Sequence, residues 1–171
     1  MPASEKTLAD AFYETLKDVY FAEKKSVKAC KTSAKAAKAP ELKQAFEHHG
    51  EESMHHLERL TQVFEIIGKP AKAKTCDAIL GITDEMAEDL EDFRDTPAAD
   101  AVIIGCGQAI EHYEMARYGM LKNWAAQLGL ADAAKLLDAT LQEEKKADAL
   151  LTQIAEKSVN AKAQAGKAKA A

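Results

Sequence analysis

The sequence has few residues that break helices and few segments that could build sheets. It contains four prolines and eight glycines among 171 residues, and no β-branched run alternates over the length that a strand needs. Alanine, leucine, lysine and glutamate fill long stretches instead, and all have high helix propensity. The prolines stand where helices begin or are separated, at Pro2, Pro40, Pro70 and Pro97. These absences predict an all-α fold.

Cysteines and long apolar runs are also scarce. Cys30, Cys76 and Cys106 form an odd set without C-x-x-C spacing, which argues against a disulfide framework and for a reducing compartment. No apolar run reaches the length of about 18 residues that a membrane span needs, and no signal peptide is evident. The net charge of −5 disfavours broad nucleic-acid binding. We therefore expect a cytoplasmic protein with neither a membrane nor a nucleic acid as partner.

Four long helical segments and their links predict the topology. A short loop joins the first two segments and another joins the last two, so each pair forms an antiparallel hairpin. Residues 71–96 connect the hairpins, and their apolar residues repeat at intervals of three and four, which predicts a shorter helix. Two hairpins with one long crossover form the ferritin-like version of the four-helix bundle. The predicted long helices cover residues 4–38, 40–68, 97–129 and 130–160.

The chain is expected to form one domain. Residues 1–160 are assigned to the ferritin-like helical bundle, and the Ala- and Lys-rich segment 161–171 is expected to be a disordered tail. Ser4 and Thr96 are the expected N-caps of the first and third long helices, because a side-chain oxygen at that position accepts from the free backbone N–H groups.

Acidic residues interrupt the inward face of each long helix at the same depth. Apolar residues three and four apart mark that face. A buried carboxylate is costly unless it is paired or bound to a metal, so acids in the middle of four helices indicate one shared site. The acidic and histidine residues on or beside these faces are Glu23, His49, Glu52, His56, Glu111, Glu114, Glu144 and Asp148.

This set of residue types predicts a dinuclear metal site. Ferritin-like sites take one Glu from each of two helices and a Glu with a nearby His from the other two. Oxygen ligands with one or two imidazoles suit iron or manganese better than zinc. Two iron ions are the expected cofactor, with manganese or a mixed pair as the alternative. The predicted metal ligands are Glu23, His49, Glu52, Glu111, Glu114, Glu144 and Asp148.

Some choices within this ligand set stay open, between His49 and His56 and between Glu111 and Glu114. His55 has Glu-x-x-His spacing to Glu52, but its phase lies about 130° from the inward face, so it ranks lower. Helical phase also directs three residues outward, and these are expected to be solvated. Two tyrosines lie near the predicted ligands in sequence. The outward residues are His48, Glu51 and Glu143, and the tyrosines are Tyr20 and Tyr113.

Four segments are distinctive when taken together: D-V-Y-F-A-E-K (18–24), A-F-E-H-H-G-E-E-S (45–53), A-I-E-H-Y-E-M-A-R-Y-G (109–119) and Q-E-E-K-K-A-D (142–148). With them the chain resembles the YciE/YciF family of bacterial ferritin-like proteins, which is associated with stress responses. The resemblance implies a four-helix bundle with an added helix, often dimeric, and a dinuclear metal centre. It supplies no established reaction.

Two functions compete at this point, and a third, a cage-type iron store, lacks evidence in the sequence for the several interfaces that cage subunits need. The first is a redox protein of the ferroxidase or peroxide-scavenging type, in which two carboxylate-bridged metal ions react with dioxygen or peroxide. The second is a non-catalytic structural or binding bundle whose acids hold a static metal or form ion pairs. A homodimer is the expected assembly in either case.

Overall fold

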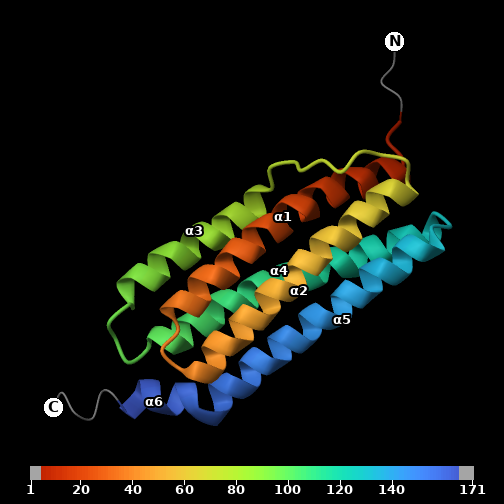
Figure 1. Cartoon of the computed structure of the whole chain (residues 1–171). Helices are drawn as coiled ribbons and strands as arrows, with labels where there is room; N and C mark the ends of the chain where they lie inside the picture. The colour runs from red at the N-terminus through yellow and green to blue at the C-terminus, as the bar shows by residue number, and fades with distance from the viewer. Residues whose placement is uncertain (1–4, 166–171) are drawn as a thin grey trace.

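The computed structural model describes residues 5–165, and four long helices lie side by side in it (Figure 1). α1 packs against α2 and α4, and α5 packs against the same two helices, so the two predicted hairpins form one bundle. α3 lies on the outside against α4 and α1. The prediction of a ferritin-like four-helix bundle with an extra helix in the crossover is confirmed. The helices are α1 (Leu8–Ala36), α2 (Pro40–Ile66), α3 (Asp77–Asp92), α4 (Ala99–Gln127), α5 (Ala131–Ile154), the π-helical turn η1 (Ala155–Val159) and α6 (Asn160–Ala165).

The starts of α1 and α4 differ from the prediction. Thr7, not Ser4, caps α1: the Thr7 hydroxyl accepts from the backbone N–H of Asp10, and the Asp10 carboxylate accepts from the backbone N–H of Thr7 at 2.8 Å. This is a capping box with aspartate as its acid. The N-cap of α4 is Ala98, and Thr96 accepts a hydrogen bond from the backbone N–H of Ala98 at 3.2 Å, so it closes the turn before the helix. Ser4 lies outside the described residues.

The predicted ends of α2 and α4 are confirmed. Gly68 and Gly129 follow these helices with φ of 65° and 74°, a backbone region that glycine adopts without strain. The tail differs in part from its prediction, because residues 161–165 belong to α6. Residues 166–171 of the expected disordered tail lie outside the described residues.

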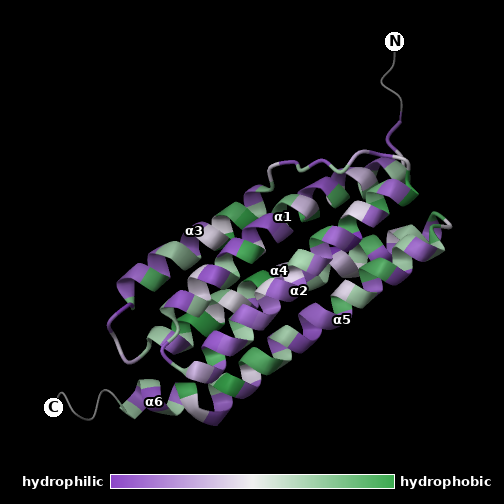
Figure 2. Cartoon of the chain, viewed as in Figure 1, coloured by the Kyte–Doolittle hydropathy of each residue, from purple (hydrophilic) through white to green (hydrophobic). Residues whose placement is uncertain are grey.

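Polar and apolar residues both occur along every helix of the bundle, as amphipathic packing requires (Figure 2). Among residues 5–165, no helix combines the length and the apolar composition of a membrane span.

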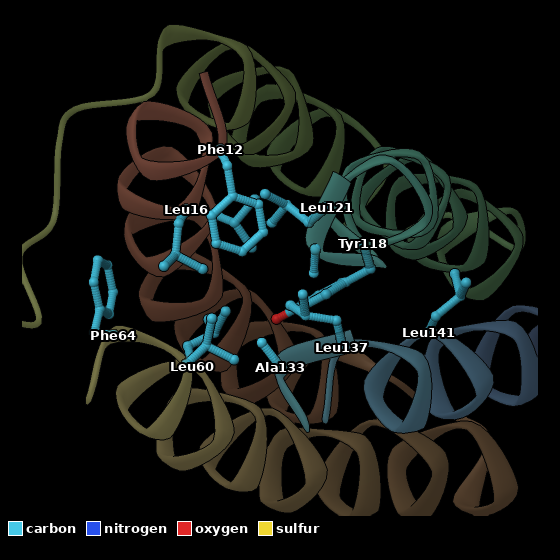
Figure 3. Packing of buried hydrophobic residues seen from close by; sticks show 12 residues of the cluster. Phe12, Leu16, Leu60, Phe64, Tyr118, Leu121, Ala133, Leu137 and Leu141 are labelled. Atoms are coloured by element: carbon cyan, nitrogen blue, oxygen red, sulfur yellow. The ribbon is translucent and has the colours of Figure 1, made fainter. Parts of the chain in front are cut away.

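Two apolar clusters fill the two ends of the bundle. The Tyr118 cluster includes Phe12, Leu60 and Leu137 (Figure 3), and the Phe46 cluster includes Leu42, Ile103 and Leu151. Burial of each such side chain contributes about 1.5–3 kcal/mol. On each long helix, the acids and histidines of the predicted site lie between the residues of these two clusters. The fold therefore encloses the predicted site between two water-excluding layers.

Gly107 leaves room for the Phe46 ring of α2 against α4 beside this site. A Cβ atom at Gly107 would lie 2.9 Å from two ring carbons of Phe46, which is closer than packed side chains come. The ring therefore packs directly on the α4 backbone.

Candidate metal centre

Six polar side chains from all four long helices converge at the middle of the bundle. None of the six residues is more than 4% exposed. Their helical phase directs them inward, and the apolar clusters above and below keep water away. They are Glu23 of α1, His49 and His56 of α2, Glu111 and Glu114 of α4, and Glu144 of α5.

These side chains form two groups with one member in common. In each group, one potential ligand atom per residue lies within 4.8 Å of all the others. Glu144 belongs to both groups, so its carboxylate is placed to serve two neighbouring positions. The first group is His49, Glu111, Glu114 and Glu144, and the second is Glu23, His56 and Glu144.

The Glu144 carboxylate lies between the two imidazole rings. Its Oε2 atom is 3.3 Å from Nε2 of His49, and its Oε1 atom is 3.1 Å from Nδ1 of His56. The same ring nitrogens lie 3.1 Å from Oε1 of Glu111 and 3.2 Å from Oε1 of Glu23, respectively. Each imidazole therefore faces two carboxylates with one nitrogen.

Many of the converging atoms make no hydrogen bond of good geometry among the described residues, although ring nitrogens and carboxylate oxygens lie 3.1–3.3 Å apart. A buried polar atom without a partner costs about 1–3 kcal/mol, so this concentration at one point needs an explanation. The donors are carboxylate oxygens and imidazole nitrogens, which fit iron or manganese. The unpartnered atoms are Oε2 of Glu23 and Glu111, Oε1 of Glu114, both carboxylate oxygens of Glu144, Nε2 of His49, Nδ1 of His56 and the hydroxyl of Ser53.

Burial and mutual repulsion raise the pKa of three of the four acids. Burial is the main cause in each case: it raises the pKa of Glu111 to about 8 and that of Glu23, and together with neighbouring carboxylates it holds the pKa of Glu114 well above its usual range. For Glu144 burial acts in the same direction, but His49 and His56 outweigh it and lower the pKa to about 2. Of the four acids, Glu144 is therefore the one whose ionised form the metal-free site favours.

The two histidines hold protons more strongly than usual. Burial disfavours the imidazolium form of His56, but Glu144 and Glu23 prevail and raise the pKa of His56 to about 10. Burial likewise opposes protonation of His49, and Glu111, Glu144 and Glu52 raise its pKa well above the usual range. A cation that binds here must displace protons.

Neighbouring side chains hold two of the buried acids in place. The Tyr118 hydroxyl donates to Oε1 of Glu23, and the Ser26 hydroxyl donates to Oε2 of Glu114 at 3.3 Å. Tyr118 is fully buried, so this contact is shielded from water.

The outer nitrogen of each histidine contacts a partly exposed carboxylate. Nδ1 of His49 lies 3.2 Å from Oε2 of Glu52, and Nε2 of His56 lies 2.9 Å from Oε2 of Glu143. Arg59 donates two hydrogen bonds to the Glu143 carboxylate, one of them at 3.0 Å. Such outer contacts fix the orientation of a ligating histidine.

The structure brings together five of the seven predicted ligands and leaves two beside the site. The Glu52 side chain is 27% exposed and contacts the outer side of His49. Asp148 accepts a hydrogen bond from Gln108 at 2.9 Å and belongs to neither group. Its side chain is one carbon shorter than glutamate. The five residues in the groups are Glu23, His49, Glu111, Glu114 and Glu144.

Three further residues of the site stand outside the predicted ligand set. His56, an alternative to His49 in the prediction, is part of the second group. Tyr118, not Tyr20 or Tyr113, contacts a buried acid, and its spacing of four from Glu114 would have indicated this. Glu143 is only 25% exposed and is paired, so the expectation that it is solvated is wrong. Its long side chain turns toward α2, which helical phase does not reveal.

The fold and the position of these residues define a ferritin-like helical bundle with a buried cluster of acids and histidines at its centre. The chain belongs to the family described as a domain of unknown function (DUF892), which matches residues 7–164. It is 41% identical to Protein YciF of Escherichia coli (strain K12) over 160 residues, which are 93% of this chain and 96% of YciF. The resemblance to the YciE/YciF family is thereby confirmed.

Solved structures agree with this assignment. The crystal structure of the E. coli stress protein YciF matches with a TM-score of 0.86 at 41% identity, covering 91% of this chain and 99% of that chain. YcfI of Rhodopseudomonas palustris, for which a structural role is suggested, matches with a TM-score of 0.84 at 36% identity, covering 89% of this chain and 97% of that one.

Proposed function

We propose that this protein is a dinuclear iron or manganese protein that reacts with dioxygen or peroxide under oxidative stress. The observation that carries the proposal is the set of unpartnered carboxylate oxygens and imidazole nitrogens that four helices direct to one buried point. The description of E. coli YciF as a stress protein supports a role of this kind.

The residues divide into two coordination sets in this proposal. His49, Glu111 and Glu114 would hold one ion and Glu23 and His56 the second, and Glu144 could serve either, as its place in both groups supports. Such ions, when bound in their reduced state, would supply the electrons for the reduction of dioxygen or peroxide.

The chain itself supplies orientation and protection from solvent. Tyr118 orients Glu23 and Ser26 orients Glu114 through hydrogen bonds, while the Tyr118 and Phe46 clusters exclude bulk water. Glu52 and Asp148 take supporting roles beside the site. A homodimer in the cytoplasm, with neither membrane nor nucleic acid as partner, completes the proposal.

A static, structural site is the second candidate, and one observation favours it. In the metal-free protein the charge of Glu144 is already balanced by His49 and His56, which lie 3.3 and 3.1 Å from its oxygens. Ion pairs of this kind stabilise a fold without any reaction. The structural role suggested for YcfI is in line with this candidate.

Metal content and oxygen consumption distinguish the two candidates. Protein expressed in iron- and manganese-supplemented medium should contain about two ions per chain by elemental analysis, and Glu144→Gln should reduce this content while the surface variant Glu51→Gln should not. Ferrous protein mixed with air should then consume oxygen. Bound metal without oxygen consumption supports the static site, and wild-type protein without bound metal refutes the metal centre.

A further inference from the structure

The two metal-ligand groups differ in how they connect to the surface. In each, a buried histidine faces the interior acids with one ring nitrogen and a partly exposed glutamate with the other. The two glutamates, Glu52 and Glu143, have side chains that are 27% and 25% exposed. Among the described residues, however, only Glu143 is paired with an arginine.

On the His49 side, potential ligand atoms follow one another from the surface to the interior. Nε2 of His48, whose side chain is 67% exposed, lies 3.5 Å from Oε1 of Glu52. The other oxygen of Glu52 lies 3.2 Å from Nδ1 of His49, and Nε2 of His49 lies 3.1 Å from Glu111. No arginine or lysine contacts Glu52 in the described chain. This side therefore presents to solvent a carboxylate whose partners are the two histidines and not an arginine or lysine.

On the His56 side, the guanidinium group of Arg59 already pairs with the carboxylate of Glu143, which corresponds to Glu52. Arg59 binds both oxygens of Glu143 and also donates to the Thr140 hydroxyl at 3.3 Å. A bidentate arginine–carboxylate pair is geometrically specific and strong among ion pairs. Its positive charge also repels an approaching divalent cation.

We propose that divalent cations reach the site past His48 and Glu52, that the Arg59–Glu143 pair keeps the other side closed, and that the His49 group is therefore filled before the His56 group. This inference rests on the proposed function. Glu144 offers one oxygen to each ring nitrogen, so it is placed to pass an ion from the first group to the second.

Cobalt(II) tests this order because its absorption depends on its ligands and its binding needs no redox reaction. Rapid mixing of Co²⁺ with metal-free full-length protein should give two absorbance phases. Glu52→Gln removes the carboxylate charge from the route and should slow both phases about tenfold, the lower end of the electrostatic acceleration seen in charged clefts. The number of Co²⁺ ions bound at saturation should be unchanged, because Glu52 belongs to neither group.

Arg59→Met opens the second side and should accelerate the second phase until the two phases merge. Arg59→Lys keeps the positive charge and should retain two phases. The matched controls are Glu51→Gln, an exposed neighbour of Glu52, and Arg94→Met, an exposed arginine paired with Glu91. Both controls should behave as wild type.

Each failure has a distinct signature. If Glu52→Gln leaves both phases unchanged, or if Arg59→Met preserves their order, the proposed route is wrong while the metal centre stands. If wild-type protein binds no Co²⁺, Fe²⁺ or Mn²⁺ at all, the metal centre and the route fall together. Since Glu52 is partly exposed on the surface of α2, its glutamine variant should fold normally, and circular dichroism checks this.

Discussion

The substitution Glu144→Gln in metal-free protein, compared with Glu114→Gln, tests how charge is distributed in the buried site. Glutamine keeps the shape of the carboxyl group and removes its charge. Glu144 is ionised at neutral pH, because His49 and His56 lower its pKa to about 2 against the opposing effect of burial. Burial and neighbouring carboxylates hold the pKa of Glu114 well above its usual range, which favours its neutral form. The same substitution should therefore have unequal effects at the two positions.

The magnitude follows from the shift in pKa. The pKa of Glu144 falls from 4.5 to about 2, a difference that corresponds to about 3 kcal/mol at about 1.4 kcal/mol per unit. His49 and His56 limit the loss by releasing protons, so Glu144→Gln should destabilise the fold by about 2–3 kcal/mol. This lowers the midpoint of thermal unfolding by about 4–12 °C for a chain of this size. Glu114→Gln should change stability by less than about 1 kcal/mol, because one neutral group replaces another.

The sign of the pH dependence is also determined. Since the folded-state pKa of Glu144 is depressed, its stabilising contribution is present above about pH 4.5 and is lost as the pH falls through about 2. The difference between wild type and Glu144→Gln should therefore be full at pH 7 and shrink progressively below pH 4.5.

Thermal unfolding followed by circular dichroism, after chelation of metals, measures these differences. Glu51→Gln is the exposed control and should unfold as wild type does. Equal destabilisation by Glu144→Gln and Glu114→Gln, or no destabilisation by Glu144→Gln, would refute this charge distribution. In metal titrations both variants should lose affinity, because both residues belong to the first group.

Three further outcomes are expected. Glu111 and His56, whose pKa values are raised to about 8 and about 10, hold protons at neutral pH. The apparent affinity for Mn²⁺ in calorimetric titrations should therefore rise between pH 6 and pH 8, by up to about tenfold per pH unit for each proton displaced. An affinity that does not change with pH would contradict these protonation states. Gly107→Ala should destabilise the fold by about 1–3 kcal/mol in urea unfolding, because its Cβ atom would lie 2.9 Å from the Phe46 ring, whereas Gly119→Ala, with open space around it, should not destabilise. Thr7→Ala should cost about 1 kcal/mol in the same assay by removing the cap of α1, and an unchanged unfolding midpoint would show that this capping box contributes nothing.

Local sequence rules predicted most of the fold, but they misplaced the N-caps of α1 and α4. Pro40 and Gly68 bracket α2 as expected, because both act through their own backbone. The start of α1 was missed because the rule for a capping box favours glutamate or glutamine, while this chain uses Asp10 to bond the backbone of Thr7. At α4, Thr96 has the side chain of an N-cap but lies too early to act as one.

The sequence by itself determined that the acids of the site lie on the inward faces of their helices. Helical spacing alone places Glu23, Glu111, Glu114 and Glu144 on apolar faces, because the direction of each Cβ atom is a property of a single helix. Which of these side chains meet was decided by the tertiary structure. His56 faces Glu23 and Glu144, while Glu52 and Asp148 lie beside the site. Contact between side chains of different helices depends on the relative offset of the helices along the bundle and on side-chain length. The phase of a single helix encodes neither of these.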